Sequence, residues 1–407
     1  MITFKYTAID PASNERIKSE IQADSELSAA KAIKKQGFAP IEVTPIDKES
    51  NLLGKIFQRI STKDRVLFSR QLATLINAGL PLVQSLHNVM EQTSNKKFKL
   101  IIAQVIGDVE GGQPLSKALA AFPQVFDEVF INLVAAGEVS GTLDVSLQRV
   151  ADQQEKQAEI ISKVRGAMAY PSVVVMVMVL VVGFMVLNVL PQVEKIYQDI
   201  PNVKLPFITR ILLSVSNFTR KYWWVELVVL SILVFFTTRW ARTLGGKTAI
   251  DAVKLRAPLF GQLFFKMYMA RFARIGGTMV ASGVPLLQTL SVTAKAVNNV
   301  HIAASIQKAS EKVKGGKALS EALTDDPYFL PLVPNMLKIG EQSGQLEQMM
   351  VKTADYYEKE VDNQIKTIST IIEPFLMILL GAAALIIVAA VLLPIYGLAG
   401  QEGGLAR

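Results

Sequence analysis

One short motif with an acidic side chain occurs twice in the chain. Gly137-Glu138-Val139-Ser140-Gly141 recurs as Gly340-Glu341-Gln342-Ser343-Gly344. The carboxylates of Glu138 and Glu341 could bind a partner's arginine or a shared cation. The alternative is a joint between two helices, in which the glycines adopt left-handed backbone conformations and the serine caps the following helix. We favour the joint, since turns of this composition usually exist for their backbone geometry.

A third carboxylate lies at the border of an apolar segment. Glu373 precedes Pro374, which opens a 22-residue apolar stretch ending at about Ile395. An ionised carboxylate is costly inside a membrane. Either Glu373 pairs with a cation on another helix or on a partner protein, or it lies in the headgroup region beside Lys366 and is solvated. The sequence leaves both interpretations open.

Other kinds of chemistry find little support. The chain has no cysteine, which excludes disulfides, thiolate zinc sites and cysteine nucleophiles. The serine of the repeated motif stands one place too late for a nucleophile elbow. Gly246-Lys247-Thr248 resembles the end of a phosphate-binding loop, but Ala241 stands where that motif requires its first glycine. We therefore expect no enzyme activity and no catalytic, cofactor-binding or metal-binding residue.

Charge and hydropathy indicate a membrane protein rather than a nucleic-acid-binding one. The 407 residues carry a net charge of +8, and half of them are hydrophobic. No basic motif with interleaved aromatic residues is present, so we do not expect nucleic-acid binding. Lysine and arginine near apolar segments are typical of the cytoplasmic faces of membrane proteins, where they can also contact anionic lipid.

The repeated motif belongs to a longer duplication. Gly79-Leu80-Pro81-Leu82 matches Gly283-Val284-Pro285-Leu286 at an offset of 204 (283 minus 79), and Phe68 and Arg70 match Phe272 and Arg274. After one residue is lost, Gly137 matches Gly340 and Pro171 matches Pro374 at an offset of 203 (340 minus 137). Gly79, Pro81, Gly283 and Pro285 are turn-forming residues, and we expect each proline in the first turn of the next helix.

The duplicated segments have a helical period and no strand signal. Residues 61–170 read as six helices, the first opened by a capping box at Ser61 and Asp64. Residues 263–373 are the second copy. The sequence thus predicts two homologous six-helix bundle domains, and the sixth helix of each runs on into an apolar segment.

Three apolar segments predict membrane-spanning helices at 171–190, 223–240 and 374–395. Ser172–Leu190 contains 19 uncharged residues, which as a helix measure about 28 Å, close to the hydrocarbon thickness. Pro171 and Pro374 should act as hinges at the membrane interface. The intervening loop, 191–221, carries an amphipathic stripe from Phe207 to Phe218 that should lie on the membrane surface.

The first 48 residues form a separate small module. Alternating residues around Phe4 and Tyr6 predict a strand, Arg16–Ala23 a second, and Ile41–Ile46 a third, with a helix ended by Gly37 before the last. A turn is expected at Asp10–Asn14 and a helix cap at Asp24 or Ser25. So small a module has a weak core and should lean on a neighbour. Residues 47–61 read as a linker.

Two spans lie between the two copies, so both copies should be on the same side of the membrane. Lys156, Lys163 and Arg165 precede the first span, and five basic residues follow the second. The loop 191–221 is also basic, which weakens the contrast. A large folded domain before the first span independently favours a cytoplasmic N-terminus and two cytoplasmic repeats.

These residues resemble one family. The Ala-Gly-Leu-Pro and Ser-Gly-Val-Pro turns, the paired Gly-Glu-Xaa-Ser-Gly motifs, the Tyr-Pro and Glu-Pro entries to the spans and the Phe-Lys-Tyr-Xaa-Ala start are similar to the type II secretion F and type IV pilus PilC family. The similarity covers nearly the whole chain. One departure is at Asn14 and Glu15, where relatives often have glycine.

The resemblance implies an inner-membrane platform protein that forms homo-oligomers at the base of a pilus or secretion machine. Its implied partners are a cytoplasmic assembly or retraction ATPase, pilins or pseudopilins, and other inner-membrane assembly proteins. The platform would couple the ATPase to polymerisation of pilin subunits, and Glu373 could then face a pilin. The alternative is a subunit of a membrane transporter or channel, although three spans with almost no intramembrane charge speak against it.

Overall fold

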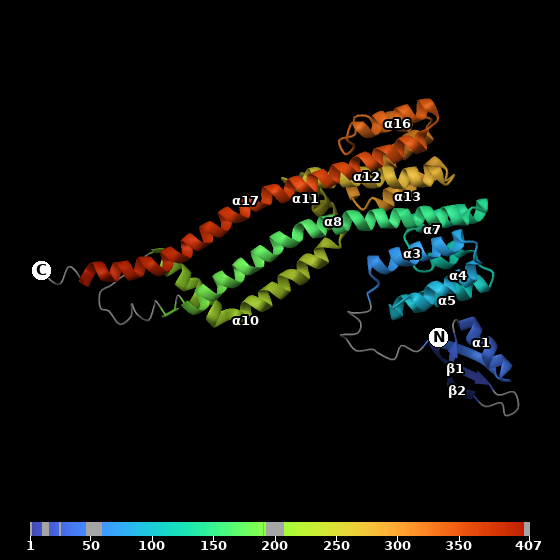
Figure 1. Ribbon diagram of the computed structural model, residues 1–407, viewed down its shortest axis with the longest axis horizontal. Coiled ribbons are helices and arrows are strands. Elements are labelled where there is room, and N and C mark those ends of the chain that lie inside the picture. The colour runs from blue at the N-terminus through green and yellow to red at the C-terminus, as the bar shows by residue number, and fades with distance from the viewer. Residues whose placement is uncertain are drawn as a thin grey trace. The chain divides into compact units, whose positions relative to one another are not determined.

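The computed structural model describes residues 2–9, 16–23, 26–45, 59–189, 191–192 and 207–402. The chain divides into two compact units (Figure 1): Met1–Ile161 with Phe265–Lys359, and Ser162–Phe264 with Glu360–Arg407. Several predicted features lie outside the described residues: the turn at 10–14, the cap at 24–25, most of the linker 47–61, and positions 193–206 of the loop between the first two spans.

The N-terminal module is a three-stranded antiparallel sheet with one helix. Its elements are β1 (Ile2–Ile9), β2 (Arg16–Ala23), α1 (Glu26–Lys35) and β3 (Ala39–Pro45), in the sheet order β2-β1-β3. Tyr6 and Ile33 form a small core of their own, whereas Phe4 joins the core of the first helical repeat. The module therefore leans on its neighbour, as its small size predicts.

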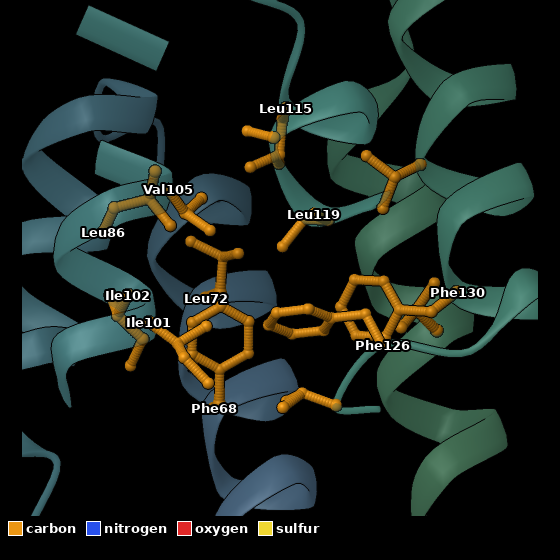
Figure 2. Packing of buried hydrophobic residues seen from close by; sticks show 14 of the residues in the cluster. Phe68, Leu72, Leu86, Ile101, Ile102, Val105, Leu115, Leu119, Phe126 and Phe130 are labelled. Carbon is orange, nitrogen blue, oxygen red and sulfur yellow. The ribbon is translucent and has the colours of Figure 1, made fainter. Parts of the chain in front are cut away.

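The first repeat contains the six predicted helices. They are α3 (Thr62–Asn77), α4 (Leu82–Gln92), α5 (Lys96–Glu110), α6 (Leu115–Ala120), α7 (Glu128–Ser140) and α8 (Leu143–Phe184). The capping box of Ser61 and Asp64 is confirmed. Figure 2 shows the core, in which the Phe68 ring centroid lies 5.6 Å from that of Phe126.

The second repeat has the same order of helices. They are α12 (Phe260–Ala281), α13 (Leu286–Ala296), α14 (Val300–Lys314), α15 (Leu319–Leu323), α16 (Leu332–Ser343) and α17 (Leu346–Glu402). Phe272 and Phe329, which correspond to Phe68 and Phe126, again pack together, with ring centroids 5.0 Å apart. The same aromatic pair thus holds the centre of each bundle.

The turn between the first two helices is also the same in both repeats. Gly79 and Gly283 have φ of +84° and +77°, a left-handed conformation that glycine adopts without steric cost. Pro81 and Pro285 stand one place earlier than expected, at the N-cap rather than inside the first turn. At that position their fixed φ still suits the start of a helix.

The two repeats pack against each other within the first unit. Ile275, Met279, Val284 and Val292 of the second repeat join the hydrophobic core of the first. Polar contacts border this region: the Gln288 side chain donates to Asn132 at 2.7 Å, and Lys295 pairs with Glu128 at 2.9 Å. The contact joins α7 and α8 of the first repeat to α12 and α13 of the second.

The second unit contains the apolar parts of α8 and α17, with η1 (Met185–Val189), α10 (Phe207–Ala241) and α11 (Leu244–Arg256). Three of the described helices are long and apolar enough to cross a membrane. The backbone of α10 departs from helical geometry at Tyr222, between the stretch predicted to be amphipathic and the predicted second span. The helix α11 follows that span and was not predicted.

The predicted fold class is confirmed: the chain is an all-α membrane protein with two homologous six-helix bundles, three apolar helices and a small N-terminal α+β module. Pro171 lies inside α8 and Pro374 inside α17. Both long helices thus continue from a bundle through the proline into the apolar segment.

Candidate functional site

Glu138 caps the short helix α6. Its carboxylate accepts hydrogen bonds from the backbone N–H groups of Leu115 and Ser116 and from the Ser116 hydroxyl, the last at 2.5 Å. Pro114, at the N-cap of α6, supplies no side-chain cap. The first N–H groups of a helix need acceptors, and a negative charge is favourable there. Glu138 provides both from a helix 22 residues further along the chain.

Glu341 makes the same contacts in the second repeat. It accepts from the backbone N–H of Leu319 at 2.6 Å and from the Ser320 hydroxyl at 2.5 Å, at the start of α15. Each motif contacts its own repeat. Since both carboxylates already accept several hydrogen bonds, the arrangement favours a structural joint over a site for a partner's arginine or a cation.

The two glycines of each motif have different roles. Gly141 and Gly344 end α7 and α16 in the left-handed conformation, with φ of +73° and +70°. Gly137 and Gly340 are helical and lie where the next helix passes closely. A Cβ on Gly137 would approach the Ser146 Cβ to 2.6 Å, and one on Gly340 would approach the Leu346 Cα to 2.9 Å.

The predicted role of the motif serine is wrong. The Ser140 hydroxyl donates to the carbonyl of Ala136 at 2.7 Å, inside the helix that ends, rather than capping the helix that begins. Ser343 donates to Ile339 at the same distance. A serine hydroxyl near a helix C-terminus can reach the carbonyl four residues earlier, and this local bond competes with capping.

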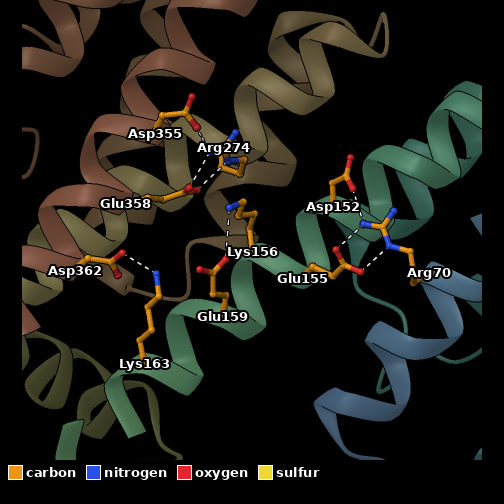
Figure 3. Close-up of polar contacts among 10 residues, drawn as sticks. All are labelled: Arg70, Asp152, Glu155, Lys156, Glu159, Lys163, Arg274, Asp355, Glu358 and Asp362. Carbon is orange, nitrogen blue, oxygen red and sulfur yellow. Dashed lines mark hydrogen bonds and ion pairs between the residues drawn. The ribbon is translucent and has the colours of Figure 1, made fainter. Parts of the chain in front are cut away.

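A second duplicated cluster ties the first helix of each repeat to its last (Figure 3). Arg70 of α3 donates to Glu155 of α8 at 2.6 and 2.5 Å and to Asp152 at 2.5 Å. Arg274 of α12 donates to Glu358 of α17 at 2.8 Å through two nitrogens and to Asp355 at 2.5 Å. Two parallel bonds to one carboxylate hold the guanidinium in a defined orientation.

The clusters differ in burial. Arg274 and Glu358 are 16% and 15% exposed, whereas Arg70 and Glu155 are 30% and 42% exposed. The hydrogen bond from Arg70 lowers the pKa of Glu155, with burial acting in the opposite direction. Burial lowers the pKa of Arg274, but its bonds to Glu358 and Asp355 outweigh this and raise the pKa overall.

The acidic members of these clusters were not among the predicted site residues, although the sequence carries a signal for them. Ala151-Asp152-Gln-Gln-Glu155-Lys156 recurs as Ala354-Asp355-Tyr-Tyr-Glu358-Lys359. The offset is again 203 (355 minus 152). Extending the repeat past the Gly-Glu-Xaa-Ser-Gly motif would have identified these pairs.

Charged side chains of both repeats also line a cavity of about 460 Å³ in the first unit. It lies between the bundle part of α8 and the helices α12 and α17, and its lining includes Arg149, Asp152, Lys156, Arg274 and Glu347. Among the described residues no group of three His, Asp or Glu side chains could hold a metal ion.

Residues near the predicted membrane entries lie in the second unit. Lys163 of α8 pairs with Asp362 of α17 at 2.6 Å (Figure 3). Glu373 is exposed on α17, and among the described residues it has no hydrogen-bond or ion-pair partner. The carboxylate of Glu373 is therefore available to headgroup water or to a cation on a partner protein.

Family comparisons match nearly the whole chain. The model "Type II secretion system (T2SS), protein F" matches residues 68–191 and again 272–394, and "Type II secretion system protein F, N-terminal domain" matches residues 1–44. The two matches of the first model reproduce the internal duplication.

Curated relatives are similar to this chain over nearly their whole lengths. A protein of Thermus thermophilus named "Type IV pilus assembly protein PilC" is 36% identical over 98% of this chain and 99% of its own. A Myxococcus xanthus protein of the same name is 36% identical over 95% and 93%. A Pseudomonas aeruginosa protein named "Type II secretion system protein F" is 33% identical over 98% and 99%.

Proposed function

Because the chain belongs to the type II secretion system protein F family of inner-membrane platform proteins, we propose that it couples a cytoplasmic assembly ATPase to the polymerisation of pilins or pseudopilins. The observation that carries the proposal is the match of both repeats and the N-terminal domain in one order. Relatives named for pilus assembly and for secretion have similar identity, so the proposal covers either machine.

In the proposed arrangement the N-terminal module and both bundles lie in the cytoplasm. An even number of spans between the repeats supports a common side, and the basic residues flanking the first and second spans support the cytoplasmic side. The chain would form homo-oligomers and contact other inner-membrane assembly proteins there. The proposed membrane-spanning segments are 171–190, 223–240 and 374–395, with 191–221 on the opposite face.

The proposed mechanism is mechanical. The arginine clusters tie α3 to α8 and α12 to α17, so a displacement of either bundle would also displace the helix that runs on into the membrane. Pro171 and Pro374 would act as hinges, since each lacks the N–H that would bond to the carbonyl four residues earlier. Joint movement of α8 and α17 is supported by the pair of Lys163 and Asp362, which joins them.

The mechanism is tested by substituting the two hinge prolines and measuring pilus assembly or secretion in the cell. Pro171→Ala and Pro374→Ala restore one helical hydrogen bond each and should stiffen the entries without lowering stability. We expect loss of pilus assembly or secretion with unchanged protein levels and unchanged co-purification of the ATPase. A matched control is Pro123→Ala, in a loop of the first bundle. Full activity of both hinge variants would contradict the mechanism.

The proposed function has a second test, made with the purified protein. Purified protein should form stable oligomers and bind the ATPase and the pilins of its own machine. A monomer that binds neither would contradict the proposed function. Solute flux through liposomes containing the protein alone would instead support a transporter or channel.

A further inference from the structure

The contact between the two repeats joins two different faces. The first repeat contributes α7 and α8, which we call the donor face, and the second contributes α12 and α13, the acceptor face. Since each repeat contains both faces, one donor face and one acceptor face are not used in the contact between the two repeats. The free donor face is on α16 and α17 of the second repeat, and the free acceptor face is on α3 and α4 of the first.

We infer that these two faces join copies of this chain, with α16 and α17 of one copy packing on α3 and α4 of the next in the arrangement seen between the repeats. A contact between unlike faces is head-to-tail, and it builds rings or open arrays rather than twofold dimers. The inference deepens the proposed oligomeric platform by naming the surface that connects its subunits.

The polar pair of Gln288 and Asn132, at the border of the contact, has equivalents on the free faces. Gln288 of the acceptor face donates to Asn132 of the donor face at 2.7 Å. At the repeat offsets these positions correspond to Gln84 (288 minus 204) and Asn335 (132 plus 203). Both residue types are therefore retained, and both side chains are exposed. A second copy would bring them together as Gln288 and Asn132 are brought together here.

The free donor face carries apolar surface that its counterpart buries. Leu133 is fully buried, whereas its equivalent, Met336, is half-buried. Gln153 is 8% exposed, whereas its equivalent, Tyr356, is 49% exposed. Ile339 adds another side chain that is 51% exposed. Neighbouring exposed apolar side chains on a bundle outside the predicted spans indicate a protein interface.

Charge also favours this pairing. The free donor face carries exposed Lys338 and Lys352, while the free acceptor face carries exposed Glu91 where the internal acceptor face has Lys295. The internal pair of Lys295 and Glu128 is not copied, because Pro331 occupies the position of Glu128. The charge at this one acceptor position is instead reversed, so that acidic Glu91 would stand opposite the basic side chains of the free donor face. This opposition allows copies to associate in one sense and disfavours donor-to-donor contact.

The absence of cysteine from the sequence makes a direct test possible. Gln84→Cys and Asn335→Cys are made in separate full-length chains, co-expressed in membranes and treated with a short bismaleimide. We expect cross-linked dimers only when both variants are present. The double variant in one chain should yield a ladder of higher oligomers. The internal pair Asn132→Cys with Gln288→Cys should cross-link within one chain and serves as the positive control.

Matched negative controls come from exposed, equivalent positions on another pair of helices, Gln104→Cys on α5 and Lys308→Cys on α14. Cross-linking of Asn335→Cys with itself would show a twofold contact and overturn the inference. The inference would also be overturned if Gln84→Cys and Asn335→Cys cross-linked with a yield no higher than that of the controls. Oligomers that persist in that case, joined through another face, would leave the proposed function standing.

A second variant tests the energetics. Ile339→Arg replaces an exposed side chain and should leave the bundle folded. It should weaken self-association about ten-fold or more, because it places a charged side chain one helical turn from Asn335 in the inferred contact. Sedimentation of the detergent-solubilised protein measures this change, with Lys308→Glu as the control. An unchanged association constant would overturn the inference.

Discussion

Glu138 accepts hydrogen bonds from both the backbone N–H and the hydroxyl of Ser116, and this pair joins the end of one helix to the start of another within the first repeat. The second repeat holds the same relationship between Glu341 and Ser320. The conspicuous acidic motif is therefore directed inward at its own bundle. Its glycines allow close packing and a sharp turn, and its carboxylate completes a helix that has no cap of its own.

The first prediction concerns this cap. Glu138→Gln removes the charge from the helix start and one acceptor oxygen, so we expect a loss of about 1–2 kcal/mol of stability. Hydrogen exchange at Leu115 and Ser116 should rise more than elsewhere. Thermal unfolding of the full chain in detergent and exchange mass spectrometry measure both effects. Val139→Ala, at a side chain that is 91% exposed, is the control. Unchanged protection of α6 would contradict the capping role.

A second prediction separates the two glycines. Gly137→Ala should destabilise by steric overlap with Ser146, and Ser146→Gly should recover part of the loss. Gly141→Ala should cost about 1 kcal/mol through its positive φ alone, without rescue by Ser146→Gly. A double-mutant cycle on unfolding temperature detects the difference. If Ser146→Gly rescued Gly137→Ala and Gly141→Ala equally, the different roles assigned to the two glycines would be refuted.

The arginine clusters provide a third prediction. Arg274→Ala leaves Glu358 unpaired at a site that is 15% exposed and should cost about 3 kcal/mol. Arg70→Ala should cost only about 0.5–1 kcal/mol, because that pair is more exposed to solvent. Arg274→Lys should recover part of the loss, since lysine cannot make the two parallel bonds. Urea unfolding measures the stability of each variant. A larger loss of stability for Arg70→Ala than for Arg274→Ala would contradict the prediction.

The Arg70 cluster should also show a pH dependence. The pKa of Glu155 in the folded protein lies below its ordinary value of 4.5, chiefly because Arg70 donates to it. The stabilisation is therefore complete above pH 4.5 and is lost as pH falls through the lowered pKa. The difference in unfolding temperature between wild type and Arg70→Ala should narrow below pH 4.5. A gap that widens on acidification would refute the pairing.

The last prediction addresses Glu373. No described residue pairs with it, so Glu373→Gln should leave the unfolding temperature unchanged or raise it slightly. If the carboxylate binds a cation on a partner, pilus assembly or secretion should fall while protein levels stay constant. Lys366→Gln, two turns earlier on the same helix, is the control. Unchanged machine output would assign Glu373 to the headgroup region.

Sequence by itself determined the parts of this protein that depend on local pattern. The duplication, the six helices of each repeat, the glycine turns and the three apolar helices all follow from periodicity, turn residues and length. The helices, turns and apolar segments are each encoded by residues that lie close together in the chain, so they can be predicted from the order of the residues. The duplication added a check, because each local prediction could be made twice at a constant offset.

Tertiary structure decided which distant groups meet. The acceptors of the Ser116 N–H and of the Arg70 guanidinium lie 22 and 85 residues away, and helix periodicity does not specify such partners. The hydroxyl of Ser140 was assigned wrongly because Ser140 is the last residue of α7, and the next helix begins only at Leu143. Only the packing of α7 on α13 showed which faces of the two repeats are joined to each other. Such choices depend on the orientation of whole helices, which is set by the shape of the completed core.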